Sequence, residues 1–231
     1  MEFDRSSSIH LGKLRRGFSS PRIAPYDLLA ANDALRSLDL YEWNTAVSAA
    51  CYATLQGVEI ALRNTVHDQL TGYHLRRGLP QPWVDDPLRL LDARRHADLR
   101  QARQRLQIQG YPAEPDRIVA ALSFGFWNYL LSGRYEHTLW TPALRLGFPH
   151  LTPPRRHALA YPVSRLHRLR NRLAHHEPVH GRDLARDHED MLFVLGSISP
   201  TMRAWAEGNS ALPGVLGVRP APVRIPLPRC P

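Results

Sequence analysis

The most regular feature of the sequence is a run of apolar residues at helical spacing between residues 40 and 70. Apolar side chains recur every three or four positions along it, at Leu40, Trp43, Val47, Ala50, Leu55, Val58, Leu62, Val66 and Leu70. The run contains no proline, and Gly72 follows it. Because glycine weakens a helix and commonly follows its last residue, the pattern predicts one long helix that stops near Gly72.

The same periodicity predicts helices along most of the remaining chain. They are expected over residues 26–38, 88–108, 116–133, 154–175 with a bend or restart at Pro162, 184–198 and 202–206. Within 116–133, the string SFGFW at 123–127 is apolar enough to lie in the core, and Gly125 would let another helix approach closely. No segment alternates polar and apolar residues with a period of two. The expected fold class is therefore all-α.

The two ends of the chain differ from this helical body. Residues 1–24 are polar, and residues 212–231 contain six prolines with almost no periodicity. We therefore expect a flexible arm over 1–24, a single helical domain over 25–208 and a proline-rich tail over 209–231. The tail is expected to add little to the core, so truncation after Ala211 should leave the melting temperature nearly unchanged.

Composition limits which cellular compartment and which classes of partner can be expected. There are two cysteines in 231 residues, which indicates no disulfide framework. Neither a secretory signal nor an apolar run of membrane-spanning length is present, so we expect a cytoplasmic protein without a membrane partner. The formal net charge of +9 favours polyanionic partners such as nucleic acid. Lys13 is the only lysine among the 30 basic residues, so the arginines also fit a coding bias.

Residues 165–180 concentrate the titratable chemistry, with four arginines and four histidines. The string HEPVH at 176–180 matches the H-E-x-x-H pattern of zinc proteases, which places two histidines on one helix face. Pro178 stands between His176 and His180 and restricts Glu177 before it, so the helix should end near His176. The two histidines then share no helical face. The sequence therefore predicts neither a zinc protease nor a bound metal, and a metal site on the loop is the alternative left open.

The overlapping string RNRLAH at 170–175 offers a different chemistry. The guanidinium of Arg170 can grip a phosphate with two parallel hydrogen bonds, and His175 can exchange a proton near neutral pH. Asn171 is four residues before His175 and can hydrogen-bond to it on one helix face. These three residues suffice for RNA cleavage in which the ribose 2′-hydroxyl attacks the adjacent phosphate, without a metal or another cofactor.

The spacing of the pair complicates this hypothesis. Arg170 and His175 are five residues apart, which is about 140° around a helix axis. Either the arginine side chain bends round, or the helix distorts before Pro178, or a second copy of the chain completes the site. The last option favours a homodimer formed through the motif helix. The simpler alternative is a solvated cationic helix end, where positive charge suits the helix dipole.

Four strings together resemble the Abi-like family of abortive-infection proteins. They are LRNRLAHHEPV at 169–179, YEWNTAVSAACYATLQGVEIALRN at 41–64, IVAALSFGFWNYLLSGRYEHTLW at 118–140 and DLARDHEDML at 183–192. That family resembles the HEPN superfamily, whose R-x-x-x-x-H motif Arg170, Asn171 and His175 match. The resemblance implies a HEPN-like bundle of long antiparallel helices with extended arms at both ends.

The resemblance also implies a function and its partners. It implies a metal-independent endoribonuclease, a hydrolase acting as a dimer in bacterial antiviral defence or as a toxin restrained by an antitoxin or a regulatory RNA. The alternatives are a non-catalytic RNA- or nucleotide-binding protein of the same fold, and a helical subunit whose basic face binds an acidic protein.

Six further residues are candidates for supporting roles. His176 and Glu177 match the family string, and Glu177 could orient a histidine or pair with Arg172; the alternative for both is capping and loop formation. Glu59 and Arg63 have the spacing of an intrahelical ion pair, with Asn64 next to them. The alternative is that Glu59 or Asn64 faces the motif helix and positions Arg170.

Overall fold

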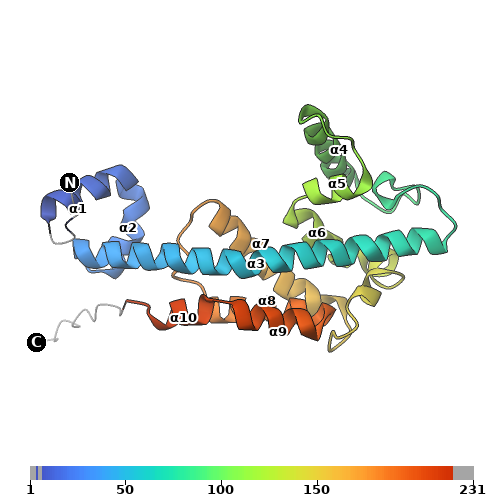
Figure 1. The fold of residues 1–231 in the computed structure, drawn as a ribbon. Coiled ribbons are helices and arrows are strands. Elements are labelled where there is room, and N and C mark those ends of the chain that lie inside the picture. The colour runs from blue at the N-terminus through green and yellow to red at the C-terminus, as the bar shows by residue number, and fades with distance from the viewer. Residues whose placement is uncertain (1–3, 5–6, 221–231) are drawn as a thin grey trace, which may run out of the picture. The chain divides into compact units, whose positions relative to one another are not determined.

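Helices account for every regular element in the part of the chain that the structure describes, residue 4 and residues 7–220 of a computed structural model (Figure 1). The predicted all-α class is confirmed. Within these residues no helix combines the length and the apolar character needed to cross a lipid bilayer. The chain divides into two compact units, the first holding residues up to 52, 172–185 and those from 211 onward, and the second holding 53–171 and 186–210.

The longest element is α3 (Ala34–Arg76), with 43 residues. The apolar positions predicted to be its buried face are buried, from Leu40 to Leu70. The prediction of a stop at Gly72 is wrong, because one glycine inside a helix costs only about 1 kcal/mol. The last helical residue is Arg76, and Gly78 follows it with a φ of 69°, the left-handed conformation that closes many helices. There the amides of Gly78 and Leu79 donate to the carbonyls of Leu75 and His74.

The first unit begins with two helices in the region expected to be an arm, α1 (Ser8–Phe18) and α2 (Ser20–Leu29). Arg15 of α1 donates to Asp27 of α2 at 2.7 Å, and the hydroxyl of Ser37 donates to the same carboxylate at 2.6 Å. Tyr26 is 1% exposed and belongs to the core of this unit. Hydrophobic periodicity did not predict these helices, because their exposed faces are polar and each buries few side chains. The helix expected over 26–38 is interrupted at Ala31 and Asn32, both with positive φ.

The first unit also includes α10 (Leu212–Gly217), in the region expected to be a tail. Leu212 is fully buried, and the indole of Trp43 donates to the carbonyl of Val215 at 2.9 Å. The guanidinium of Arg219 lies 4.9 Å from the centre of the Trp43 ring. Residues 212–219 therefore do contribute to the core, contrary to the expectation. The rest of the predicted tail, residues 221–231, lies outside the described residues.

The second unit contains α6 (Phe124–Leu130), α9 (Pro200–Asn209) and most of α7 (Arg156–Ala174) and α8 (Leu184–Ile198), together with residues 53–76 of α3. Phe124, Phe126 and Trp127 are at most 1% exposed, which confirms the prediction that SFGFW lies in the core. The side chain of Arg165 on α7 pairs with the buried Asp190 on α8 at 3.0 Å. These apolar and ionic contacts fix α7, the helix that carries the candidate motif.

The apolar segment expected to form one helix over 116–133 is two helices, α5 (Pro115–Ala121) and α6. Leu122 and Ser123 have extended backbone between them. Short 3-10 turns η2 (Gly133–Tyr135) and η4 (Leu144–Gly147) and a π-turn η3 (Glu136–Trp140) follow in the stretch expected to be irregular. The break was hidden because the segment is apolar on all sides and gives no periodic signal for a change of direction.

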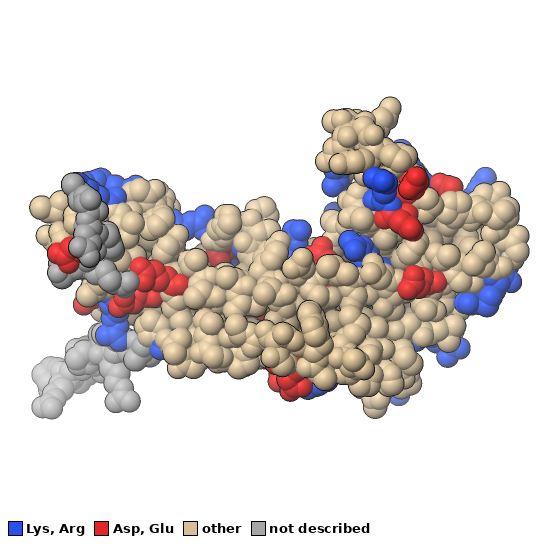
Figure 2. Space-filling view, in the orientation of Figure 1, with Lys and Arg blue, Asp and Glu red and all other residues tan. Residues whose placement is uncertain are grey.

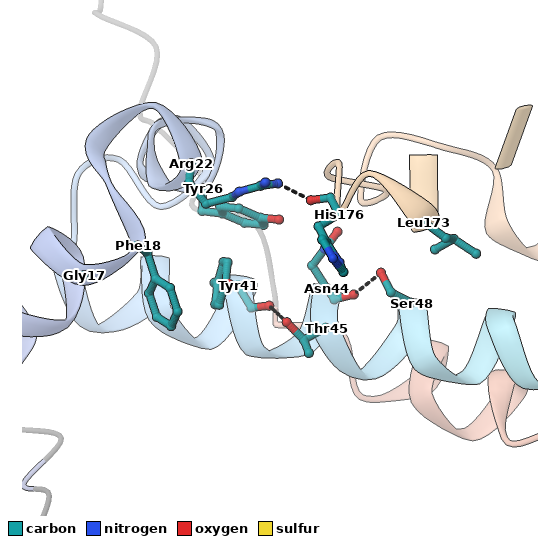
Figure 3. Close-up of a pocket in the computed structure, with 10 residues that line it drawn as sticks. All are labelled: Gly17, Phe18, Arg22, Tyr26, Tyr41, Asn44, Thr45, Ser48, Leu173 and His176. Carbon is teal, nitrogen blue, oxygen red and sulfur yellow. Dashed lines mark hydrogen bonds between the residues drawn. The ribbon is translucent and has the colours of Figure 1, made fainter. Parts of the chain in front are cut away.

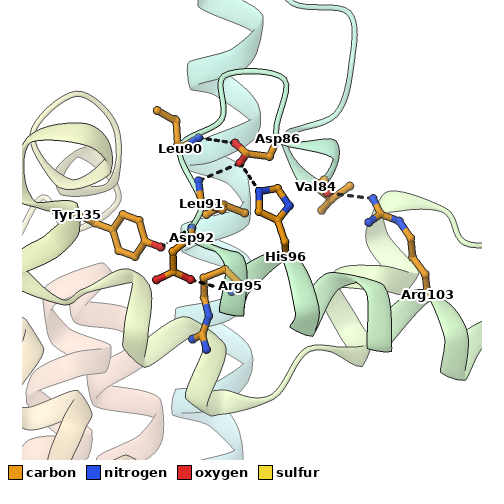
Figure 4. Close-up of polar contacts among 9 residues, drawn as sticks. All are labelled: Val84, Asp86, Leu90, Leu91, Asp92, Arg95, His96, Arg103 and Tyr135. Carbon is orange, nitrogen blue, oxygen red and sulfur yellow. Dashed lines mark hydrogen bonds and ion pairs between the residues drawn. The ribbon is translucent and has the colours of Figure 1, made fainter.

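A network of polar contacts shapes the loop before α4 (Ala93–Ile108) (Figure 4). The buried carboxylate of Asp86 accepts hydrogen bonds from the amides of Leu90 and Leu91 at 2.8 and 2.9 Å, and it pairs with His96 at 3.0 Å. Asp92 then caps α4 by accepting from the amide of Arg95 at 2.9 Å. The helix therefore begins at Ala93 rather than at residue 88, because Asp92 satisfies its free amides.

Candidate functional site

The candidate motif lies at the C-terminal end of α7, and the helix ends in a Schellman motif. The amide of His176 donates to the carbonyl of Leu173 at 3.1 Å, and the amide of Glu177 donates to the carbonyl of Arg172 at 2.8 Å. His176 has a φ of 54°, the left-handed conformation that this motif requires. Pro178 follows and cannot continue a helix. The prediction that the helix ends near His176 is confirmed, since its last residue is Ala174.

This helix end separates the two histidines of the HEPVH string. His176 is exposed beyond the last turn, whereas His180 is half-buried with its ring centre 5.4 Å from that of Tyr26. Burial, together with Arg219 and Arg172, lowers the pKa of His180 below its ordinary value. In the part of the chain that is described, no group of three or more His, Cys, Asp or Glu side chains is arranged to hold a metal ion. The string therefore matches the zinc-protease pattern in sequence, but its two histidines do not share the helix face on which that pattern depends.

Arg170 lies on α7 and faces α3 within the second unit. Its Nε is 3.8 Å from Oε2 of Glu59, and the side chain is 32% exposed. Of the two alternatives for Glu59, the structure shows the one in which it faces the motif helix. Arg63 instead donates to Asn64 at 3.2 Å, on the same helix. Glu59 is therefore the acidic neighbour of the Arg170 guanidinium, and Arg63 and Asn64 contact each other.

Asn171 contacts a histidine that the sequence analysis did not single out. Its amide nitrogen lies 3.3 Å from Nε2 of His167, one turn earlier on α7. An amide nitrogen can only donate, so this ring nitrogen accepts. Burial, then the charges of Arg170 and Arg168, lower the pKa of His167, which keeps the ring neutral and able to accept. Within its own unit Asn171 therefore contacts His167, four residues before it. The expected partner, His175, is four residues after it.

His167 is itself held by α6. A Cβ added at Gly125 would lie 3.1 Å from Nε2 of His167, and the Phe124 ring packs edge-on against the imidazole with the centres 5.9 Å apart. Gly125 thus permits the close approach that was expected of it. The signal that could have identified His167 is its spacing, four residues before Asn171 on the same helix face.

His175 and Glu177 belong to the first unit. His175 directly follows the last residue of α7 and is exposed. Oε2 of Glu177 lies 3.5 Å from Nε of Arg172, whose guanidinium also donates to the carbonyl of Pro178 at 3.0 Å. Of the roles considered for Glu177, the structure shows the ion pair with Arg172. This pair ties the loop after the helix to the last turn of α7.

The first unit contains a cavity of about 350 Å³ beside this helix end (Figure 3). Aromatic rings of Phe18, Tyr26 and Tyr41 line it, and His176 and Arg22 bring polar groups to it. The guanidinium of Arg22 donates to the carbonyl of His176, which joins α2 to the loop after α7. Rings that can stack, with a cation beside them, suit a planar base attached to a phosphate. The sequence analysis missed this cavity because three of these five residues lie on α1 and α2, in the segment treated mostly as an arm.

Basic side chains do not form one continuous surface on the face seen in Figure 2. Lys and Arg lie there in separate small groups, several of them next to Asp or Glu. Independently of this view, ion pairs join Arg103 to Asp85 at 2.6 Å and Arg117 to Glu114 at 3.5 Å. On this face, therefore, the net charge of +9 is not gathered into one basic surface.

Comparison of the chain with known protein families, with curated proteins and with solved structures finds no match. The motif residues, and the contacts that each makes within its own unit, are therefore the features that bear on function.

Proposed function

We propose that this protein is a metal-independent endoribonuclease of the HEPN type that acts in abortive infection or as a toxin. The observation that carries the proposal is the pairing of Arg170 with Glu59 on α3. Arg170 lies on the segment of α7 that ends at the exposed His175. An arginine with a fixed partner and part of its side chain open to solvent suits a phosphate ligand. An exposed histidine at a defined helix end suits proton transfer near neutral pH.

The proposed reaction needs only groups of the protein and of the RNA. Arg170 holds the scissile phosphate, and His175 moves the proton as the 2′-hydroxyl attacks that phosphate. Asn171, fixed by His167, supplies a further polar group on the motif helix. A new bond forms between the 2′-oxygen and phosphorus, and the bond to the 5′-oxygen breaks. The 5′-oxygen takes up a proton and leaves as the hydroxyl of one product, and a 2′,3′-cyclic phosphate remains on the other.

The test is cleavage of total RNA by the purified protein in the presence of EDTA. We expect cleavage with EDTA, products ending in a 2′,3′-cyclic phosphate and no cleavage of DNA, which lacks the attacking hydroxyl. General acid–base catalysis is worth about 10²–10⁴-fold in rate, so His175→Ala should lose activity by that factor and keep RNA binding. His137→Ala, at another exposed histidine, is the matched control. Inhibition by EDTA, or full activity of His175→Ala, would contradict the proposal.

We further propose that the active form is a homodimer in which two copies bring their motif helices together. Arg170→Ala and His175→Ala each lack one half of the motif. If the halves from two copies meet, an equimolar mixture of the two inactive variants regains part of the activity. Light scattering on the wild-type protein measures the assembly independently, and a monomer at micromolar concentration would contradict it.

The second candidate function is binding of RNA or a nucleotide without cleavage, and the cavity lined by Arg22 and the aromatic rings favours it. In this case His175→Ala binds as the wild type does, and no cleavage is seen with either. Arg22→Ala, which removes the cation at the cavity, weakens binding. Fluorescence anisotropy with a labelled oligoribonucleotide measures both variants.

A further inference from the structure

The cavity beside the end of α7 has polar groups in its wall as well as aromatic rings. Tyr26, Asn44, Thr45 and Ser48 line it, and all four belong to the first unit. Tyr26 is 1% exposed and Asn44 is 6% exposed. Buried polar groups are normally hydrogen-bonded, so the partners of each group show what the cavity leaves unmatched.

The carboxamide of Asn44 has a fixed orientation. Its Oδ1 accepts a hydrogen bond from the amide of Val179 at 2.8 Å, and a backbone amide can only donate. The other end of the group, Nδ2, is therefore a donor. It has no partner among the described residues, yet it is not one of their unpartnered polar atoms that are sealed from water. Because Asn44 is otherwise buried and lines the cavity, this donor is open to the cavity.

The hydroxyl of Tyr26 is a second donor of this kind. It too has no partner among the described residues and is not sealed from water. In Figure 3 it points toward His176, on the opposite side of the cavity. Burial raises the pKa of Tyr26 to about 12, so the phenol keeps its proton at neutral pH and can donate it.

The hydroxyls of Ser48 and Thr45 have the opposite character. Ser48 already donates to the carbonyl of Asn44 at 2.6 Å, and Thr45 donates to the carbonyl of Tyr41 at 3.1 Å. With its one hydrogen used, each oxygen can only accept a further bond. The wall of the cavity therefore offers donors at Asn44 and Tyr26 and an acceptor at Ser48, one turn further along α3.

We propose that this cavity binds one base of the RNA and prefers guanine or uracil to adenine or cytosine. Guanine and uracil present a carbonyl beside a ring N–H, which matches donors at Asn44 and Tyr26 with an acceptor at Ser48. Adenine and cytosine present an amino group beside a ring nitrogen that accepts, which is the reverse pattern. Phe18 and Tyr41 supply the rings on which a base can stack.

This inference rests on the function proposed above, because it takes RNA as the ligand. His176 lines the cavity and directly follows His175 in the chain. A base bound here would therefore belong to a nucleotide close to the histidine that moves the proton. The cavity would then give the enzyme a sequence preference, or give a non-catalytic binder its selectivity.

Two matched pairs of nucleotides test the preference with the wild-type protein. Inosine and adenosine 3′-monophosphates differ only in the carbonyl or amino group and the ring proton beside it, and so do the uridine and cytidine 3′-monophosphates. In isothermal titration calorimetry we expect inosine or uridine to bind about tenfold more tightly than its partner. A difference in the first pair alone would mean that the cavity accepts a purine, and in the second alone a pyrimidine. Equal affinity within both pairs, or no binding at millimolar concentration, would overturn the inference.

The same titration separates this inference from the proposed cleavage. The four probes contain no phosphodiester bond, so their affinities do not depend on whether the protein cuts RNA. A protein that prefers inosine or uridine but does not cut RNA contradicts the proposed nuclease and supports the base site. A protein that cuts RNA but binds both members of each pair equally overturns the base site alone.

Two variants locate the binding. Asn44→Asp keeps the oxygen that accepts from Val179 but replaces the donor with an acceptor, so the preference within each pair should be lost or reversed. Tyr26→Phe removes only the hydroxyl, and it should weaken the preferred nucleotide by about 2–10-fold even if Asn44→Asp fails to fold. Tyr52→Phe, at a tyrosine that is 45% exposed and does not line the cavity, should change nothing. Affinities that match the wild type in both Asn44→Asp and Tyr26→Phe would place the base elsewhere and overturn the inference.

Discussion

The side chain of Arg170 has an acidic partner in Glu59, and its planar, two-pronged shape is what the proposed chemistry uses. The sequence was sufficient to identify Arg170, Asn171 and His175 as candidates, because their residue types and spacing carry the chemical signal. It was not sufficient to identify His167 as the partner of Asn171. That contact depends on which face of α7 is turned toward α6. From the local sequence alone, Asn171 could contact a histidine either one turn before it or one turn after it.

Arg170→Lys should reduce RNA cleavage by about 10–100-fold, because lysine keeps the charge but loses the paired hydrogen bonds to a phosphate. The rate of cleavage of a labelled RNA measures the effect. Arg168→Lys is the control, since Arg168 is exposed on the same helix and donates to Ser164 at 3.2 Å. Equal activity of the two variants would argue that Arg170 does not grip the phosphate.

His176 offers a prediction about stability at the same scale. A residue other than glycine in the left-handed conformation costs roughly 1–2 kcal/mol, and a β-branched residue is least tolerated there. We therefore expect His176→Gly to be at least as stable as the wild type and His176→Val to be less stable than the glycine variant by about 1–2 kcal/mol. Urea unfolding followed by circular dichroism measures both. Equal stability would mean that the helix end does not require a left-handed residue.

At the scale of elements, hydrophobic periodicity was a good guide wherever a helix buries one face. The bounds of α8, residues 184–198, agree with the predicted range, and α3 was recognised throughout its apolar run. Periodicity failed in two situations. It missed most of α1 and α2, which are polar and bury few residues, and it missed the break at Leu122, where the sequence is apolar on every side. Polar contacts also shape the chain locally, such as those of Asp27 between α1 and α2 and those of Asp86 before α4, and the apolar pattern does not record them.

The contact of α6 with α7 can be tested with one methyl group. Gly125→Ala places a Cβ 3.1 Å from Nε2 of His167, so we expect the imidazole to shift and the protein to lose stability despite the better helix propensity of alanine. The matched control is Gly208→Ala on α9, where nothing lies within 4 Å of the added Cβ. That variant should gain up to about 1 kcal/mol. Urea unfolding measures both changes, and equal gains would show that α7 does not approach α6 as closely as described.

The role of α10 leads to a different expectation from the one drawn from the sequence. Truncation after Ala211 removes the buried Leu212 and the carbonyl that accepts from Trp43. Loss of one buried leucine and one hydrogen bond should cost about 2–4 kcal/mol. Truncation after Pro220 leaves α10 in place and is the reference. Thermal unfolding of the two truncated proteins measures the difference. Identical melting temperatures would show that α10 does not contribute to the stability of the fold.

At the scale of the whole molecule, buried histidines link stability to pH. Burial lowers the pKa of His167, His180 and His188 below the ordinary value of about 6.5. The unfolded chain therefore binds more protons than the folded chain just below that pH. The free energy of unfolding should be at its full value above about pH 6.5 and should fall as the pH is lowered toward the folded pKa values.

Urea unfolding at pH 7.5 and at pH 5.5 measures this dependence. His188 is 8% exposed, and His188→Leu removes one of the three groups, so the difference between the two pH values should become smaller in that variant. An exposed histidine such as His137, changed to leucine, provides the comparison. A free energy of unfolding that rises on acidification would contradict the assignment of these histidines as neutral in the folded protein.

The way in which the chain is divided between its two units has a consequence for synthesis. The second unit is complete once residue 210 has been made, whereas the first unit also needs α10, whose residues 212–217 are added afterwards. A chain growing from its N-terminus must therefore wait for α10 before Trp43 receives its partner and the first unit can close. If the end of α7 and its neighbouring cavity act as proposed, a nascent chain on the ribosome would be inactive toward the RNA that surrounds it until α10 has emerged.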